Sequence, residues 1–132
     1  MVLAPARRVV PSIEVLNGVL ARCWSSETSY DPSGWSVDNP AWGHCAVTAL
    51  LVQDFHGGKL LLGAINGIEH YWNQLPNLQE LDLTRVQFQN VQSVSDGTVV
   101  SRDFVLSFPD TNRRYTRLRE LALSELHEAV RS

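Results

Sequence analysis

The chain has 132 residues, of which 44% are hydrophobic and 19% charged, which is the size and balance of a single globular domain spanning residues 1–132. A formal net charge of −3 and the lack of a basic stripe argue against nucleic-acid binding. No apolar run approaches the roughly 20 residues of a membrane helix, and the N-terminal residues do not resemble an export signal, so we expect a cytoplasmic protein with no membrane contact.

The first predicted element is a helix over residues 13–24, where apolar residues recur at helical spacing behind Ser12, a good N-cap. Residues 1–10 are expected to form a loose arm or a short strand. The next segment, residues 25–44, is rich in turn formers yet contains two Trp. A loop of this length in a compact domain is unusual and often functional, so its aromatic side chains either line a cleft or only anchor a long connection.

A second helix is predicted over residues 45–56, and because it is apolar nearly all round, it should be central and buried. Strand-like segments separated by turn residues follow it, and the chain then returns to helix. The pattern predicts an α+β fold in which the buried helix packs on a small antiparallel sheet. The expected strands are 59–65, 68–75, 78–83 and 94–100, and the expected helices are 101–107 and one from Asp110 or Thr111 to about 130.

Cys45 falls at the first turn of the central helix, and this position favours chemistry at its sulfur. Backbone N–H groups are unpaired there, and the helix dipole favours a negative charge, which stabilises a thiolate. Gly43, two residues earlier, leaves room for a substrate. The other cysteine, Cys23, lies on the apolar stripe of the first helix and reads as a core residue. Two cysteines are too few for a disulfide scaffold or a four-thiolate zinc site, so we expect free thiols in a reducing compartment.

A base and an orienting group for this nucleophile are available on two successive predicted strands. His70 would take the thiol proton and later protonate the leaving group, and Asp82 would accept from the other ring nitrogen. The backbone N–H of Cys45 would be one oxyanion donor, and we expect the second to come from the loop over residues 30–44. The sequence thus predicts a Cys-His-Asp triad.

The register of the second hairpin decides whether this triad can form, because side chains alternate between the faces of a sheet. A two-residue turn at Pro76 and Asn77 would put Asp82 on the face away from His70. A three-residue loop over residues 76–78 pairs Trp72 with Asp82 and puts His70 on the same face. The triad therefore predicts an odd-length loop or a bulge.

These segments resemble the signature blocks of the transglutaminase-like and papain-like cysteine enzymes, in which a Cys begins a buried helix, a His lies on a strand and an Asp or Asn follows on the next strand. The resemblance implies a minimal papain-like or transglutaminase-like core. Those enzymes usually carry Gln before the Cys and an aromatic residue after it, whereas this chain has His44 and Ala46. The chain resembles more closely the bacterial YunG-like family, which implies no particular activity. The blocks that carry this closer resemblance are NPAWGHCAVTA (39–49), QDFHGG (53–58), HYWN (70–73), DLT (82–84), PDT (109–111) and RY (114–115).

The predicted function is that of a cysteine hydrolase or acyltransferase acting on an amide, either a peptide bond or a Gln side chain, through a thioester. A peptide or protein substrate is expected, with no cofactor and no metal. The alternative is a non-catalytic binding or accessory protein on a degenerate papain-like scaffold, with residues 30–44 as its contact surface. The residues predicted to bind substrate are Trp35, Trp42, Gly43, His44 and Trp72.

Each residue of the predicted triad also has a purely structural interpretation. Cys45 can be a small buried apolar residue, His70 a satisfied strand residue, and Asp82 a turn cap ahead of a capping box that runs from Thr84 to Gln87. A metal site at His44, Cys45 and His70 is disfavoured, because adjacent residues rarely aim at one ion. The arginines of the last helix read as a solvated face; they are Arg113, Arg114, Arg117 and Arg119.

Overall fold

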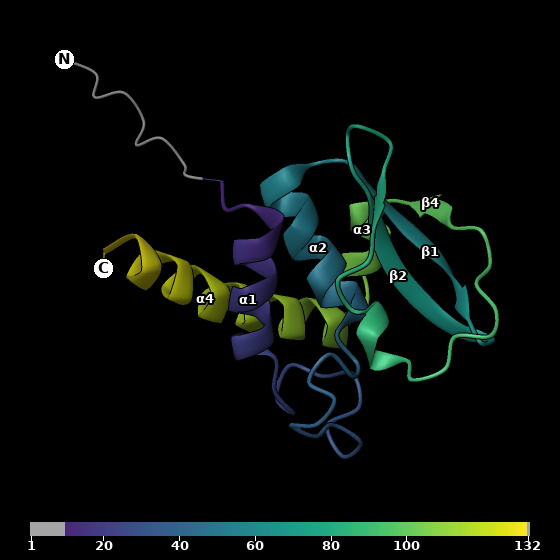
Figure 1. Ribbon diagram of the computed structural model, residues 1–132, viewed down its shortest axis with the longest axis horizontal. Coiled ribbons are helices and arrows are strands. Elements are labelled where there is room, and N and C mark those ends of the chain that lie inside the picture. The colour runs from purple at the N-terminus through teal and green to yellow at the C-terminus, as the bar shows by residue number, and fades with distance from the viewer. Residues whose placement is uncertain (1–9, 132) are drawn as a thin grey trace.

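The computed structural model describes residues 10–131, with side chains over residues 10–127. Within this range the chain combines four α-helices with a four-stranded antiparallel sheet of order β3-β2-β1-β4, which confirms the predicted α+β class. Figure 1 shows α1, α2 and α4 on one side of the sheet. The arm or short strand expected over residues 1–10 lies almost wholly outside the described residues.

The elements follow one another in an order close to the predicted one. None of the helices in the described range is long and apolar enough to cross a membrane. In chain order the elements are α1 (Ile13–Cys23), α2 (Cys45–His56), β1 (Lys59–Ile65), β2 (Ile68–Gln74), β3 (Glu80–Leu81), the 3₁₀ turn η1 (Arg85–Gln87), β4 (Thr98–Val100), α3 (Arg102–Leu106) and α4 (Pro109–Arg131).

Helix α2 is the central element, as predicted. It contacts β1 and β2 on one side and α4 on the other, and α1 packs in turn against α4. Every residue from Ala46 to Val52 is buried, which explains why α2 is apolar all round instead of having one apolar stripe. The Asn73 side chain on β2 donates a hydrogen bond to the Ala49 carbonyl of α2, 2.9 Å away. This bond ties the helix to the sheet.

Several element boundaries differ from the predicted ones, most of all those of β3 and β4. The third strand is shorter because the backbone turns at Asp82, whose Oδ1 accepts from the Thr84 N–H at 3.2 Å. The fourth strand begins only at Thr98, although Val94 still makes an isolated bridge to β1. The last helix begins at Pro109, because a proline at the first helical position lacks only an N–H that would be unpaired there.

The hairpin between β2 and β3 has the register that the triad requires. Asn73 pairs with Leu81 and Gln74 with Glu80, and the Leu75 N–H donates to the Gln79 carbonyl at 2.8 Å. The loop therefore contains three residues, 76–78, as predicted. Leu78 in this loop has a positive φ of 73°. The same register puts Trp72 opposite Asp82 and His70 on the same face, diagonal to Asp82.

Candidate active site

Cys45, His70 and Asp82 come together from three elements at the edge of the sheet beside α2. The His70 Nε2 atom lies 2.7 Å from Asp82 Oδ2. Cys45 and His70 both line a cavity of about 550 Å³. Nδ1 of His70 is buried and has no hydrogen-bond partner among the described residues. The imidazole therefore has one nitrogen held by a carboxylate and the other unpaired in a cavity that contains a thiol.

The charges around His70 favour its imidazolium form. Burial lowers the pKa of His70, but the hydrogen bond to Asp82 and the adjacent Cys45 raise it, and the net pKa is about 9. Because ionised Asp82 can only accept hydrogen bonds, Nε2 stays protonated and Nδ1 is the nitrogen whose proton can move. The hydrogen bond between His70 and Asp82 is the contact that the orienting role predicted for Asp82 requires.

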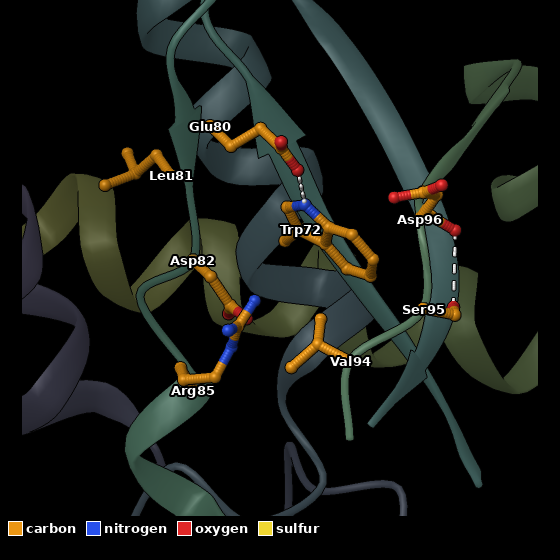
Figure 2. A pocket seen from close by; sticks show the side chains of 9 residues that line it. Trp72, Glu80, Leu81, Asp82, Arg85, Val94, Ser95 and Asp96 are labelled. Carbon is orange, nitrogen blue, oxygen red and sulfur yellow. Dashed lines mark hydrogen bonds and ion pairs between the residues drawn. The ribbon is translucent and has the colours of Figure 1, made fainter. Parts of the chain in front are cut away.

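Asp82 has two tasks in this structure. Its Oδ1 accepts from the Thr84 N–H, as the structural interpretation required, while its Oδ2 accepts from His70 and from Arg85 Nε at 2.8 Å. Burial raises the pKa of Asp82, but the hydrogen bonds from His70 and Arg85 outweigh it and hold the pKa below its usual value. Figure 2 shows Arg85 extended toward Asp82. The sequence analysis did not identify Arg85, although its i, i+3 spacing from Asp82 was a usable signal.

Aromatic rings hold the imidazole in place. Trp72 is stacked near His70 with ring centroids 5.9 Å apart, and Phe88 packs edge-on at 5.1 Å. Trp72 was predicted to bind substrate, but it lines a different cavity, of about 520 Å³, behind Asp82 (Figure 2). There its indole N–H donates to Glu80 at 2.6 Å. Phe88 lines the Cys45 cavity and was missed, since it lies outside every motif.

His44 was predicted to bind substrate, and the structure places it elsewhere. Its side chain is fully buried and does not line the cavity. Nδ1 is 2.9 Å from the Trp42 carbonyl oxygen and Nε2 is 2.7 Å from Thr28 Oγ1. Burial lowers its pKa to about 4, outweighing the hydrogen bond to Trp42, so the ring is neutral. His44 is the N-cap of α2 but makes no side-chain bond to the first turn.

The loop before α2 contributes Trp42 and Gly43 to the cavity wall but not Trp35. The Trp35 indole N–H donates to the Pro40 carbonyl at 2.9 Å, so this tryptophan closes the loop on itself. Both interpretations of the loop therefore hold, each for a different aromatic residue. Gly43 has a φ of +78°, and a Cβ there would lie 2.2 Å from Ser29 Oγ, so only glycine fits.

Two buried polar residues that the sequence analysis did not assign to the site fix the loop beside Cys45. Gln87 accepts from the Gly43 N–H through Oε1 at 3.2 Å. Arg114 is only 2% exposed, which corrects its assignment to a solvated helix face. Its guanidinium donates to Asp110 at 2.8 Å and to the Thr28 carbonyl at 3.2 Å. Its i, i+4 spacing to the buried Leu118 was the signal that could have found it.

Both thiols are free, as predicted, with Cys23 buried and Cys45 partly exposed. Burial raises the pKa of the Cys23 thiol. Over the described residues, no three His, Cys, Asp or Glu side chains are placed so that they could hold a metal ion.

Comparison with known proteins identifies relatives of the chain. The family model described as YunG protein matches residues 12–127. The chain is 33% identical over 112 residues to the uncharacterized protein YunG of Bacillus subtilis (strain 168), an alignment that covers 82% of this chain and 89% of the relative. No solved structure matches the chain significantly.

Proposed function

We propose that this chain, which belongs to the YunG family, is a cysteine hydrolase or acyltransferase that acts on an amide through a thioester on Cys45. One observation carries the proposal: His70 is buried, is fixed by Asp82 through Nε2, has no hydrogen-bond partner at Nδ1, and shares a cavity with Cys45, which raises its pKa. A buried imidazole nitrogen without a partner costs stability, so a role in proton transfer accounts for its retention. We also propose that the fold is a minimal papain-like or transglutaminase-like core. This proposal is based on the sequential order of its elements: a helix that begins with Cys, a strand with His, and then a strand followed by Asp.

Acylation is the first half of the proposed reaction. The Cys45 thiolate, stabilised by the His70 imidazolium, attacks the amide carbonyl carbon and forms a C–S bond. The carbonyl oxygen becomes an oxyanion that accepts from the Cys45 N–H at the helix start. As the tetrahedral intermediate collapses, the C–N bond breaks and the His70 Nδ1 proton passes to the leaving nitrogen. A thioester and a free amine or ammonia result.

Deacylation restores the enzyme. Neutral His70 takes a proton at Nδ1 from a water molecule or from an acceptor amine, which attacks the thioester carbonyl. The C–S bond breaks, and the departing thiolate is stabilised by the imidazolium. Water gives a carboxylic acid, and an amine gives a new amide. The same site thus supports hydrolysis and acyl transfer, according to which nucleophile reaches the thioester.

The walls of the cavity favour a peptide or protein substrate with an apolar group near the amide. Tyr30, Ile68 and Phe108 line it although 74%, 53% and 47% of each is exposed. Exposed apolar side chains around a cavity are typical of a binding site. The free thiols suit a reducing compartment, so we place the reaction in the cytoplasm.

Alkylation with iodoacetamide at pH 7, read by peptide mass spectrometry, tests whether Cys45 is activated. We expect Cys45 to react on the order of tenfold faster than N-acetylcysteine, and His70→Gln to remove that advantage. Cys23, buried in the same chain, is the internal control for unfolding and should stay unmodified. Acylation by p-nitrophenyl acetate should then release one equivalent of p-nitrophenolate in the wild type and none in Cys45→Ala. A Cys45 that reacts like N-acetylcysteine and is indifferent to His70→Gln would refute the proposal.

The exposed aromatic rim also favours the second candidate, a binding protein without catalysis. In that case the cavity holds an apolar peptide segment while Cys45 and His70 stay chemically idle. The same experiments separate the two candidates, because a binding protein gives neither the alkylation advantage nor the p-nitrophenolate burst.

A further inference from the structure

The proposed acyl transfer needs a second oxyanion donor, and the residue before the nucleophile does not supply it. His44 is fully buried, and both of its ring nitrogens are already hydrogen bonded to Trp42 and Thr28. At the helix start the backbone N–H of Cys45, the nucleophile itself, is the donor that the sequence predicted. Oxyanion sites generally use two donors, and each contributes substantially to the rate.

Most other polar side chains around the cavity are committed elsewhere. The Trp42 indole N–H donates to Asp31 at 3.1 Å, and the Gln87 amide donates to the Thr84 carbonyl at 3.0 Å. Arg114 is held by Asp110, and the Thr111 hydroxyl accepts from Arg114 at 3.4 Å but keeps its own hydrogen to donate. The other hydroxyl donors of the cavity wall are two tyrosines, Tyr30 and Tyr71.

Tyr71 is the better placed of the two. It follows His70 on β2 and therefore points to the opposite face of the sheet, the face on which Asn73 bonds to α2. Helix α2, which begins at Cys45, packs on that face, and Cys45 and Tyr71 line the same cavity. Burial, the Glu69 carboxylate and the Cys45 sulfur raise the pKa of Tyr71, with no hydrogen bond among the causes. Tyr30 instead lies over the Arg114 guanidinium, 5.6 Å from its ring centroid, and is mostly exposed.

We propose that the Tyr71 hydroxyl is the second oxyanion donor, working with the Cys45 N–H. This assignment rests on the proposed function, since an oxyanion forms only if Cys45 is acylated. Its raised pKa keeps the phenol protonated at neutral pH, as a donor must be. A second observation marks the helix start as a reaction site: the fully buried His70 lines the same cavity, and its Nδ1 has no hydrogen-bond partner among the described residues.

Two reagents with different transition states test this role in the variant Tyr71→Phe. Acylation by p-nitrophenyl acetate forms a tetrahedral oxyanion, whereas alkylation by iodoacetamide displaces iodide at a CH₂ carbon and forms none. We expect single-turnover acylation to fall about 100-fold while the alkylation rate of Cys45 stays within about twofold of the wild type. Tyr115→Phe, which removes a hydroxyl that donates to Asp54 outside the cavity, is the control and should change neither rate. The urea midpoint of Tyr71→Phe should match that of the wild type.

The other possible results distinguish a failure of the Tyr71 assignment from a failure of the proposed function. Equal acylation rates in Tyr71→Phe and the wild type would overturn the assignment and leave the proposed function standing. A parallel loss of acylation and alkylation would also overturn it, because Tyr71 would then act on the thiolate and not on the oxyanion. A wild-type protein that forms no acyl-Cys45 would overturn the proposed function, and this assignment with it.

Discussion

Replacing Asp82 by asparagine removes the charge that keeps His70 protonated, and the consequences can be worked out from the structure. In the wild type the pKa of His70 is raised from 6.5 to about 9 against the opposing effect of burial, by Asp82 and by Cys45. The amide that takes the place of the carboxylate in the variant carries no charge, so only Cys45 still opposes the effect of burial. We expect the pKa of His70 to be lower in Asp82→Asn than in the wild type.

The wild-type shift has a defined effect on stability. Each pKa unit corresponds to about 1.4 kcal/mol, so His70 protonation stabilises the fold by about 3 kcal/mol. Because the folded pKa is raised, this stabilisation is fully present below pH 6.5, declines as the pH rises, and is lost above about pH 9. In Asp82→Asn the decline in stability over that pH window should be smaller.

Two measurements check the prediction. Nitrogen-15 NMR of the His70 ring reports its pKa and its tautomer in both proteins, and urea unfolding across the window from the ordinary to the raised pKa reports the stability. The corresponding substitution in a Ser-His-Asp triad costs about 10⁴-fold in kcat because it permits the wrong tautomer, and we expect a loss of similar order in acylation here. A His70 whose pKa stays as high in Asp82→Asn as in the wild type would show that the carboxylate does not control the imidazole.

Two further pairs of variants test how the loop is held beside Cys45. Gly43→Ala should destabilise the protein by about 2–4 kcal/mol more than Gly67→Ala. Both glycines have a positive φ, but only at Gly43 would the added Cβ clash with a neighbouring atom. Equal urea midpoints for the two variants would refute this prediction. Arg114→Met should cost about 1–3 kcal/mol, because it leaves the buried Thr28 carbonyl without its donor. Exposed Arg113→Met should stay within about 0.5 kcal/mol, and calorimetry that finds the two variants alike would contradict this role of Arg114.

Local patterns determined much of the architecture from sequence. The helix after Cys45 is buried because it is apolar all round, and its place between sheet and α4 follows from that need to be covered on every side. The sequence also predicted that His70 and Asp82 could share a face of the sheet. Side chains along a strand alternate with a period of two, and the loop length sets the register. Both inferences use distances along the chain of about a dozen residues or fewer.

Local sequence patterns could not predict which distant segments of the chain come into contact. His44 faces the core and not a substrate because its ring bonds to the Thr28 hydroxyl. Arg114 is buried and not solvated because it donates to the Thr28 carbonyl, 86 positions away along the chain. Trp72 occupies a second cavity because of its own cross-strand neighbours, and Tyr71 stands beside Cys45 only because α2 lies on that face of the sheet. Residue types and periodicities specify which groups can react or be buried. Only the packing of helices on the sheet decides which of them share a cavity, because that packing sums many weak contacts over the whole chain.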